Sequence, residues 1–565
     1  MTVKKVIGDP AAYDSKQQGG ASKRGMTFCT LAFLLCVLLS VTPLNRLAGT
    51  TDLGVLPTNS VLISVGGWLP LDLGLARMAR TSQVSTHDVL FLLLVALEFL
   101  VYALALRWLQ RRLRDDDHRW ALRMIWLGTI VTGIVFVLTP AMLSHDIFAY
   151  AAYGRILAVY HANPYFVTLS AFPHDPFLPL DNWKDTPSAY GPLWTALCGL
   201  LTLCAGDHAL AYVLLYRVLG LASHLLNTLL VYAILHRMGY APRTIACGTL
   251  LYGWNPLALQ ESCLGGHNDT WMVTFMLLGL LLCVRAEQNA RLMRGYLLPV
   301  VAFSLAILVK FACLPLVAFF FILLLRKALY PSQVSLASAR LRALHWRGIV
   351  QTLLPAGLLC GGLVAAAYVP FWLGHSVHEV VQSFLAPPAA NASFGSVLEA
   401  VHKWVDAYGS YAPSWASPLI SPFAQRATWQ YMTYGIALLL AGSGVVWIWR
   451  SPTVPTLALA TLALLGGLLI VTPWFVPWYV TWLVGLAALA LPPGGSRNRR
   501  ALLLFTLVFS ATAHFVYFFF YNPQPFGGWI GLTFLTTIGP PILTLFICLL
   551  LPGSPHEDDR FTHHA

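Results

Sequence analysis

The sequence has few charged residues, and its composition differs from that of soluble domains. Asp, Glu, Lys and Arg make up 10% of its 565 residues, whereas hydrophobic residues make up 57%. Soluble domains average roughly 25% charged residues, and a soluble chain of this composition would lack the polar surface needed to cover its cores. A bilayer removes that requirement. The composition therefore predicts an all-α polytopic membrane protein and excludes a string of soluble domains.

The sequence also lacks the patterns of disulfide, zinc and nucleic-acid-binding proteins. Its 10 cysteines lie within or beside apolar stretches, with no Cys-x-x-Cys pair and no Cys/His cluster, so disulfides and structural zinc are not expected. The net charge of +12 comes from basic residues in short clusters between apolar runs. That distribution is typical of membrane topology rather than of nucleic-acid binding, and no nucleic-acid partner is expected.

Apolar runs of about 20 residues, the length that crosses the hydrocarbon core as a helix, recur along the whole chain. The run 192–205 is shorter and follows a polar loop, so it is predicted to be a juxtamembrane or half-inserted helix. We predict about fourteen spans, at roughly 26–44, 86–107, 120–141, 208–235, 243–260, 270–284, 295–309, 311–326, 347–371, 427–449, 453–472, 476–492, 501–520 and 528–551.

Most Lys and Arg residues lie on one side of these spans, which predicts a cytoplasmic N-terminus. The expected organisation is a single transmembrane domain, 26–552, with disordered cytoplasmic tails at 1–25 and 553–565. The polar chemistry then collects in extracytoplasmic loops at 45–85, 142–207, 261–269 and 372–426.

The first informative loop segment is SHDIFAYAAYGRILAVYHANPYFVTL, residues 144–169. Asp146 lies at the outer end of a hydrophobic helix, where partial desolvation would raise the pKa of the carboxyl toward the range of a general base. The structural alternative is an Asp that ends a helix and faces water.

Two further segments carry polar side chains in the same predicted loops. DNWKDTPSAYGPLW, residues 181–194, provides Lys184, Asp185 and Tyr190, and taken alone it is a turn with ordinary polar decoration. WNPLALQESCLGGHNDTW, residues 254–271, places His267, Asn268 and Asp269 at the mouth of two helices. Its alternative interpretation is helix capping by Asp or Asn.

Buried polar residues elsewhere have structural interpretations. Arg217 lies inside a predicted span, where an unpaired guanidinium is costly, so it is expected to pair with an acid or with backbone carbonyls. His514 is expected to be a satisfied interior histidine. Trp478 belongs to the aromatic run 473–483, which forms either an interfacial belt or a surface for a sugar or lipid.

Taken together and in order, these motifs resemble those of a known family. SHDIFAYAAYGR followed by NPY, then WKDTPSAYGPLW, then NPL followed by GGHND, and finally PWFVPWYVTWL extend over residues 140–485. This set resembles bacterial polyprenol-phosphate-mannose-dependent α-mannosyltransferases, integral-membrane glycosyltransferases of the GT-C superfamily.

The resemblance implies a GT-C-like bundle and an inverting glycosyltransferase in the bacterial cytoplasmic membrane, with its active site facing outward. It implies transfer of a hexose, mannose by the resemblance, from a polyprenol-phosphate donor to a glycan or glycolipid acceptor, with Asp146 as base. Many relatives carry two acids on this loop, whereas this chain has Ser144, His145 and Asp146. No cofactor is required, and the use of a divalent metal stays open.

The proposed chemistry also needs a cation for the leaving phosphate. Lys310, between two apolar runs at the outer boundary, is the first candidate, with Arg155 and Lys184 in reserve; snorkelling to the headgroups is the alternative for Lys310. The full set of expected substrate contacts is Tyr150, Tyr153, Arg155, Asn163, Tyr165, Lys184, Asp185, Tyr190, His267, Asn268, Asp269, Lys310 and Trp478.

Two other functions remain open from the sequence. A transporter or flippase of lipid-linked or anionic substrates is one, although no clear inverted repeat is present. A glycan ligase or polymerase is the other, and it would share the same outer face.

Overall fold

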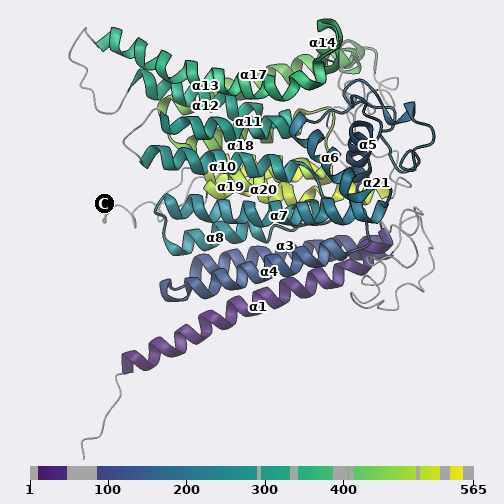
Figure 1. Ribbon diagram of the computed structural model, residues 1–565. Helices are drawn as coiled ribbons and strands as arrows, with labels where there is room; N and C mark the ends of the chain where they lie inside the picture. Colours follow the sequence, from purple (N-terminus) through teal and green to yellow (C-terminus); the bar gives the residue numbers. More distant parts are fainter. Residues whose placement is uncertain are drawn as a thin grey trace, which may run out of the picture.

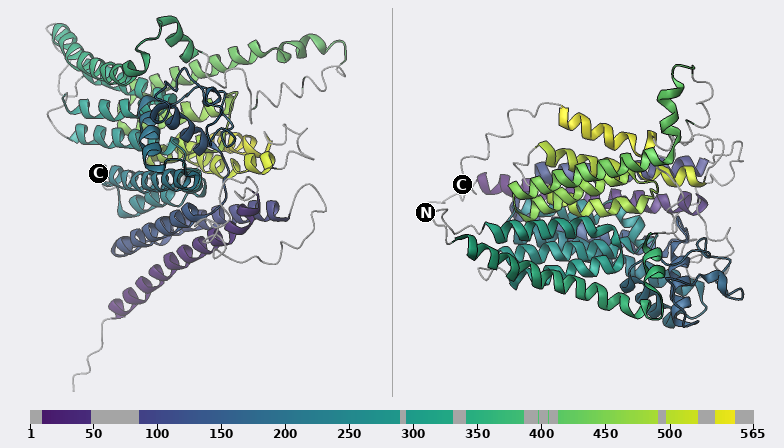
Figure 2. Two further views of the ribbon diagram at one scale, coloured as in Figure 1. Left: turned by 45° about the vertical axis from the view of Figure 1, so that its right-hand side comes forward. Right: turned by 90° about the horizontal axis from the view of Figure 1, so that it is seen from above.

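The computed structural model is a bundle of helices (Figures 1 and 2). It describes residues 10–47, 86–288, 294–330, 341–385, 413–490, 497–521 and 535–550, together with positions 397 and 405. Within these ranges there are many helices and no β-strand. The prediction of an all-α polytopic membrane protein is confirmed.

The helices follow one another along the chain with short connections in most places. In order they are α1 (Pro10–Leu47), α3 (Thr86–Arg112), α4 (His118–Leu138), α5 (Asp146–Ala158), α6 (Pro192–Ala205), α7 (Ala209–Arg237), α8 (Pro242–Gly253), α9 (Pro256–Cys263), α10 (Asp269–Gln288), α11 (Leu297–Val309), α12 (Leu314–Leu329), α13 (Leu341–Trp372), α14 (Val377–Leu385), α16 (Ser417–Ile420), α17 (Arg426–Arg450), α18 (Val454–Val471), α19 (Thr481–Ala487), α20 (Arg497–Thr512), α21 (Phe515–Tyr521) and α24 (Gly539–Leu550).

Ten of the fourteen predicted spans correspond to helices that, among the described residues, are long and apolar enough to cross a membrane. Three others, 295–309, 476–492 and 528–551, correspond to shorter apolar helices. The predicted juxtamembrane helix 192–205 is α6, with the same bounds.

The predicted single span 243–260 is instead two short helices, α8 and α9. Pro256 lacks a backbone N–H and disfavours helical geometry at the preceding residue, so the chain breaks there. Asn255 then caps α9, because its side chain accepts a hydrogen bond from the Ala258 N–H at 3.0 Å. The break separates α8 from α9, and α9 ends at Cys263, just before the segment that carries His267.

Several predicted loops and tails lie outside the described residues. These are residues 1–9, 48–85 and 553–565, together with most of 386–412. Residues 10–25, predicted as part of a disordered tail, are helical in the structure, because α1 begins at Pro10.

The long helices run roughly side by side, with α1 along one edge of the bundle and α13 and α17 along the opposite edge (Figure 1). Helices α5, α6 and α14 gather at one end, which we call the loop end, whereas α1 begins at Pro10 near the other end (Figures 1 and 2). The loop end therefore collects the described parts of the predicted outer loops.

Arg217 in α7 locks the connection between α4 and α5. Its fully buried guanidinium donates to the backbone carbonyls of Leu264, Val137, Thr139 and Ala141. The expectation that Arg217 pairs with backbone carbonyls is confirmed. Helix ends leave carbonyls without intrahelical partners. The Arg217 side chain donates to such carbonyls at the end of α4 and fixes the segment that leads to Asp146.

Replacing this guanidinium is expected to destabilise the fold. Arg217→Gln leaves buried carbonyls unsatisfied, and we expect a loss of about 3–5 kcal/mol in the free energy of unfolding, the range seen when one partner of a buried charged contact is removed. Thermal unfolding of the purified protein in detergent checks this. Arg237→Gln, at an exposed position in the last turn of the same helix, is the control; equal unfolding of both variants would contradict the lock.

Candidate active site

Asp146 begins α5 at the loop end of the bundle. Its backbone N–H donates to the Ser144 hydroxyl at 3.2 Å, and its carboxylate lies in the first helical turn, where the positive end of the helix dipole favours negative charge. The residue is 8% exposed. Asp146 is therefore largely buried but still reaches the surface.

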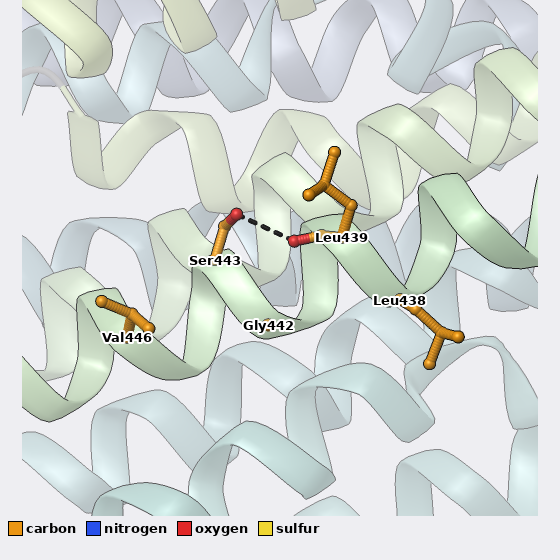
Figure 3. A pocket seen from close by; sticks show the side chains of 5 residues that line it. All are labelled: Leu438, Leu439, Gly442, Ser443 and Val446. Carbon is orange, nitrogen blue, oxygen red and sulfur yellow. Dashed lines mark hydrogen bonds between the residues drawn. The ribbon is translucent and has the colours of Figure 1, made fainter.

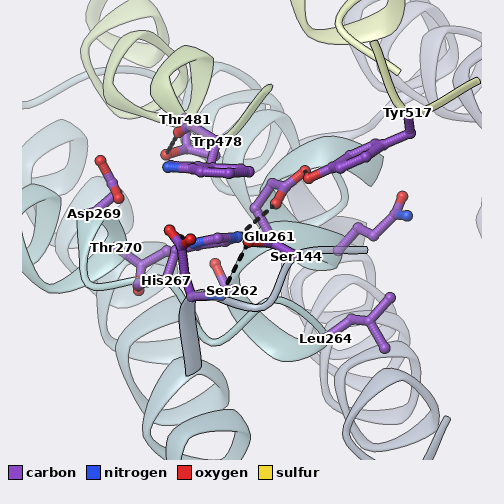
Figure 4. A network of polar contacts seen from close by, with 12 residues as sticks. Ser144, Glu261, Ser262, Leu264, His267, Asp269, Thr270, Trp478, Thr481 and Tyr517 are labelled. Atoms are coloured by element: carbon purple, nitrogen blue, oxygen red, sulfur yellow. Dashed lines mark hydrogen bonds and ion pairs between the residues drawn. The ribbon is translucent and has the colours of Figure 1, made fainter. Parts of the chain in front are cut away.

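His267 lies between two carboxylates. Its Nδ1 is 3.5 Å from Asp146 Oδ2 and its Nε2 is 3.3 Å from Glu261 Oε2. Both distances exceed those of a typical N–H···O hydrogen bond, so we describe the contacts as ion pairs. The Tyr517 hydroxyl donates to the other Glu261 oxygen at 2.7 Å, and Figure 4 shows Tyr517 reaching Glu261.

This arrangement shifts the pKa of His267 and the pKa of Asp146. Burial acts to lower the pKa of His267, but pairing with the Asp146 and Glu261 carboxylates raises it to about 9. For Asp146, burial acts to raise the pKa, but pairing with His267 and the charge of Lys310 lower it below its usual value. The expectation that desolvation raises the pKa of Asp146 is therefore wrong, because the neighbouring cations outweigh it.

The second part of the site is an ion pair between Lys310 and Asp269. Lys310 lies in extended backbone between α11 and α12, and its ammonium donates to Asp269 Oδ1 at 2.8 Å. Asp269, the first residue of α10, also accepts from the Trp482 indole N–H at 2.6 Å. The ammonium lies 4.6 Å from the centre of the Tyr479 ring and 5.8 Å from that of Tyr190. Lys310 is thus held inward by a carboxylate and aromatic rings.

Gly191 explains the Tyr-Gly-Pro part of the second motif. A Cβ atom at this position would lie 2.1 Å from the Leu308 carbonyl oxygen, so only glycine fits without a shift of the backbone. The close approach allows the Gly191 N–H to donate to the Val309 carbonyl at 3.0 Å. This contact fixes Tyr190 beside Lys310, the residue after Val309.

Other predicted residues line the same cluster. Tyr150 lies one turn after Asp146. Its hydroxyl donates to Asn268 Oδ1 and accepts from the Asn268 backbone N–H, both at 3.4 Å. Tyr153 packs its ring 6.0 Å from that of Tyr190. The Trp478 ring stacks on His267 at 4.0 Å (Figure 4), so this face of Trp478 is covered by protein.

The acidic and basic side chains that approach one another at this site we call the polar cluster. Its members are Asp146, Glu261, His267, Asp269 and Lys310. Its members come from two of the four motif segments, with Lys310 in addition.

Four predicted substrate contacts have other roles or lie elsewhere in the loops, and Arg155 is a fifth. Lys184 and Asp185 are exposed. Asn163 donates to the Phe371 carbonyl and accepts from the Tyr165 N–H, while the Tyr165 hydroxyl donates to the Tyr190 carbonyl. These contacts tie the loop to α13 and to the second motif.

Arg155 acts as a structural tie rather than a free cation. Its guanidinium pairs with Asp175 at 2.7 Å and with Asp207 at 2.6 Å, and it donates to the Gly206 carbonyl. These partners join α5 to its following loop and to the connection between α6 and α7. A reserve role in binding phosphate is therefore not proposed.

The sequence interpretation missed Glu261 and Tyr517. Glu261 was placed in an outer loop, although it is a carboxylate beside an apolar run, and such residues in membrane segments are candidates for function. Tyr517 lies in the aromatic run FVYFFFY of α21, where nothing in the pattern distinguishes one ring from the next. In the same region, His514 Nε2 donates to Gln260 Oε1 at 2.9 Å, which confirms His514 as a satisfied interior histidine.

Two further features bear on which site is functional. Among the described residues there is no group of three or more His, Cys, Asp or Glu side chains arranged to hold a metal ion. A shallow groove on α17 is lined by Leu438, Leu439, Gly442, Ser443 and Val446. The Ser443 hydroxyl donates a hydrogen bond to the Leu439 carbonyl (Figure 3). This groove is mainly apolar and is lined by no charged side chain. The polar cluster is therefore the candidate active site.

Fold and site define a polytopic membrane protein with a charged cluster at the loop end of a helical bundle. Residues 46–326 match the family described as "Alpha-(1->6)-mannopyranosyltransferase, N-terminal domain". The match and the relatives below confirm the resemblance to a bacterial α-mannosyltransferase family. Trp478, Trp482 and Tyr517, which contact the cluster, lie beyond the matched residues.

Three curated relatives are similar over part of the chain. Alpha-(1->6)-mannopyranosyltransferase A of Corynebacterium glutamicum is 25% identical over 28% of this chain and 31% of its own length. An alpha-(1->6)-mannopyranosyltransferase of Mycobacterium tuberculosis is 28% identical over 28% of this chain and 27% of its own. A probable one of Mycolicibacterium smegmatis is 27% identical over 28% of each.

Each match thus spans less than a third of the relative's length. No solved structure gives a significant match to the chain.

Proposed function

We propose that this protein is an inverting glycosyltransferase of the membrane that moves a hexose, mannose in first place, from a polyprenol-phosphate donor to a glycan or glycolipid acceptor. The relatives, named as α-(1→6)-mannopyranosyltransferases, support the sugar and the reaction class. The lipid-phosphate donor rests on the motif resemblance and on the chemistry of the polar cluster.

One observation carries the proposal: a carboxylate and an ammonium lie in the same cluster. Asp146 is ionised and partly open to solvent, and Lys310 contributes to its low pKa. Transfer from a phosphate needs a base for the acceptor hydroxyl and a cation for the leaving group. Because an ammonium has three N–H donors and Asp269 Oδ1 accepts one, Lys310 retains donors for a phosphate.

In the proposed step, the acceptor hydroxyl oxygen bonds to the anomeric carbon of the donor while the bond from that carbon to the phosphate oxygen breaks. Asp146 takes the hydroxyl proton. The polyprenyl phosphate leaves with the bonding electrons, and the Lys310 ammonium stabilises its negative charge. Attack on the side opposite the leaving group inverts the configuration at the anomeric carbon.

We also propose that the loop end faces away from the cytoplasm in the bacterial plasma membrane. The positively charged connectors between spans support this orientation. Single cysteines placed at Lys184 and at Ser376, both exposed at the loop end, are expected to react with a membrane-impermeant reagent from outside intact cells. A cysteine at Asp116, in the connector between α3 and α4, is the matched control. Labelling of residue 184 only after the membrane is opened would contradict the orientation.

The reaction is tested with purified protein in liposomes and a set of donors. We expect transfer from polyprenol-phosphate-mannose to exceed transfer from the glucose, galactose and arabinose analogues, with an acceptor α-mannoside as product. Preference for another sugar would overturn the assignment of mannose alone. Movement of the intact lipid-linked sugar across the bilayer, without any glycoside product, would favour a flippase.

A further inference from the structure

We propose that Glu261 is a positioning residue, which holds a proton on His267 so that the imidazolium in turn orients Asp146 and keeps it ionised. This inference rests on the proposed function, because Asp146 is the proposed base. Neither Glu261 nor His267 is placed in contact with the acceptor. They act through the carboxylate at the start of α5.

The geometry of the three side chains supports a chain of charges that ends inside the protein. His267 is fully buried, with 0% of its side chain exposed, and the Glu261 side chain is 1% exposed. Asp146 keeps 12% of its side chain exposed. Only the Asp146 end therefore reaches the space from which an acceptor approaches.

The contacts of His267 favour the protonated, positively charged ring. Asp146 on α5 and Glu261 on α9 face its two ring nitrogens, and the Trp478 ring covers one face. A neutral ring would leave two carboxylates facing each other across a buried space, which is costly. A protonated ring has an N–H donor on each nitrogen, so it can serve both carboxylates.

Other charged or titratable groups lie around Asp146, His267 and Glu261. Asp269 and Lys310 pair with each other, so their charges largely offset. Tyr517 on α21 donates to Glu261 Oε1, and Tyr150 on α5 contacts Asn268. None of these partners removes the need for a proton on His267. Glu261 and Asp146 both contact His267, whereas Asp269 contacts Lys310.

Glu261 is held in place from two directions. The break before Pro256 starts α9, and neighbouring residues of α9 and its cap bind the C-terminal part of the chain: Asn255 donates to Ser510 and Gln260 contacts His514 at 2.9 Å. Tyr517 adds the contact to Glu261 itself. The C-terminal helices α20 and α21 thus help to set the geometry at Asp146.

The consequence for Asp146 is specific to one oxygen. The imidazolium engages Asp146 Oδ2, so the other oxygen is left to take the acceptor proton. If His267 loses a proton, the neutral ring keeps one N–H for two carboxylates. Asp146 then loses the nearby positive charge and competes with Glu261 for the one remaining donor. Activity should therefore fall as pH rises through the pKa of His267, which pairing with the carboxylates raises to about 9.

Glu261→Gln separates this role from a purely structural one. The substitution keeps size and hydrogen-bonding capacity but removes the negative charge, so the pKa of His267 should drop by at least about one unit, as expected for loss of a close opposite charge. We expect kcat near the wild-type value at pH 6 and at least about threefold lower at pH 8.5, because a pKa lowered from about 9 by one unit leaves about a third of the imidazolium there. The KM for the lipid donor should be little changed. Glu261→Asp, which keeps the charge, should recover part of the loss.

Tyr517→Phe is the matched control, because it removes a contact to Glu261 and leaves the charge in place. Its pH profile should keep the wild-type alkaline limb. A uniform loss of kcat at every pH in Glu261→Gln, with the alkaline limb unmoved, would overturn the positioning role and leave a structural one.

A second readout does not depend on activity. In protein labelled with ¹⁵N-histidine and held in nanodiscs, the His267 signal is identified by its absence in His267→Gln. We expect an imidazolium that persists to about pH 9 in the wild type and titrates at least about one pH unit lower in Glu261→Gln. Identical titration in both proteins would overturn the inference, whereas a wild-type protein that titrates as expected but forms no glycoside would overturn the proposed function instead.

Discussion

Asp146→Asn is expected to lower turnover by roughly 10²–10⁴-fold, the contribution of a positioned general base. The amide keeps the size of the side chain and its hydrogen-bonding capacity, but it cannot take the acceptor proton. Expression and donor binding should stay close to wild type, because Lys310 and the aromatic residues around it are unchanged. Initial rates of mannoside formation in proteoliposomes measure the effect.

Asp116→Asn is the control for that substitution. Asp116 is exposed in the connector between α3 and α4. The whole length of α4, His118–Leu138, separates it from Asp146, so its loss should leave turnover unchanged. Near-normal turnover in Asp146→Asn would exclude Asp146 as the base. Asp269 would then be the carboxylate to examine, because it is the acid in contact with Lys310.

Lys310→Met is expected to lower kcat by roughly 10²–10³-fold, as when a charge-stabilising group at the reacting centre is removed, and to weaken the apparent affinity for the lipid donor. The contact between Lys310 and phosphate strengthens as negative charge develops on the leaving oxygen, so both chemistry and binding suffer. Lys310→Arg should keep partial activity, since a guanidinium also pairs with phosphate.

The ion pair with Asp269 complicates this variant, because Lys310→Met leaves a buried carboxylate without its cation. The double variant Lys310→Met with Asp269→Asn removes both charges and should recover most of the folding stability lost in the single variant. We expect its turnover to stay low. A double variant that is both stable and fully active would exclude Lys310 from binding the phosphate and leave it a structural role with Asp269.

Much of the fold was predictable because apolar length alone identifies spanning helices. The spans around α3, α7 and α18 are of this kind, and α6 was recognised as too short to cross. The break between α8 and α9 was not predicted, because the apolar run continues through Trp254-Asn255-Pro256 and hydropathy does not register the missing N–H of proline.

The candidate site was predictable only in part. Asp146, His267, Asp269 and Lys310 were chosen because polar residues beside apolar runs are conspicuous, and the structure brings them together. The contacts of Asp146 with His267 and of Glu261 with Tyr517 join segments more than 100 residues apart, and the sequence pattern contains no signal for them.

The sign of the pKa change at Asp146 shows the same limit. Position at a helix end beside the membrane predicted desolvation and a raised pKa. The neighbours His267 and Lys310 reverse that result, and neither distance follows from sequence. A carboxylate that stays ionised at neutral pH is ready to accept a proton in every molecule, and its basicity then has to come from the charge that develops on the acceptor oxygen as it attacks.

The central claim is that this protein breaks the bond between the sugar and a lipid phosphate at the polar cluster. The direct measurement is the release of polyprenyl phosphate in proteoliposomes that contain polyprenol-phosphate-mannose and an acceptor. We expect one polyprenyl phosphate released for each mannoside formed by the wild type, and almost none with Asp146→Asn. Lipid-linked mannose that crosses the bilayer intact, with no phosphate released and no difference between the two proteins, would contradict it.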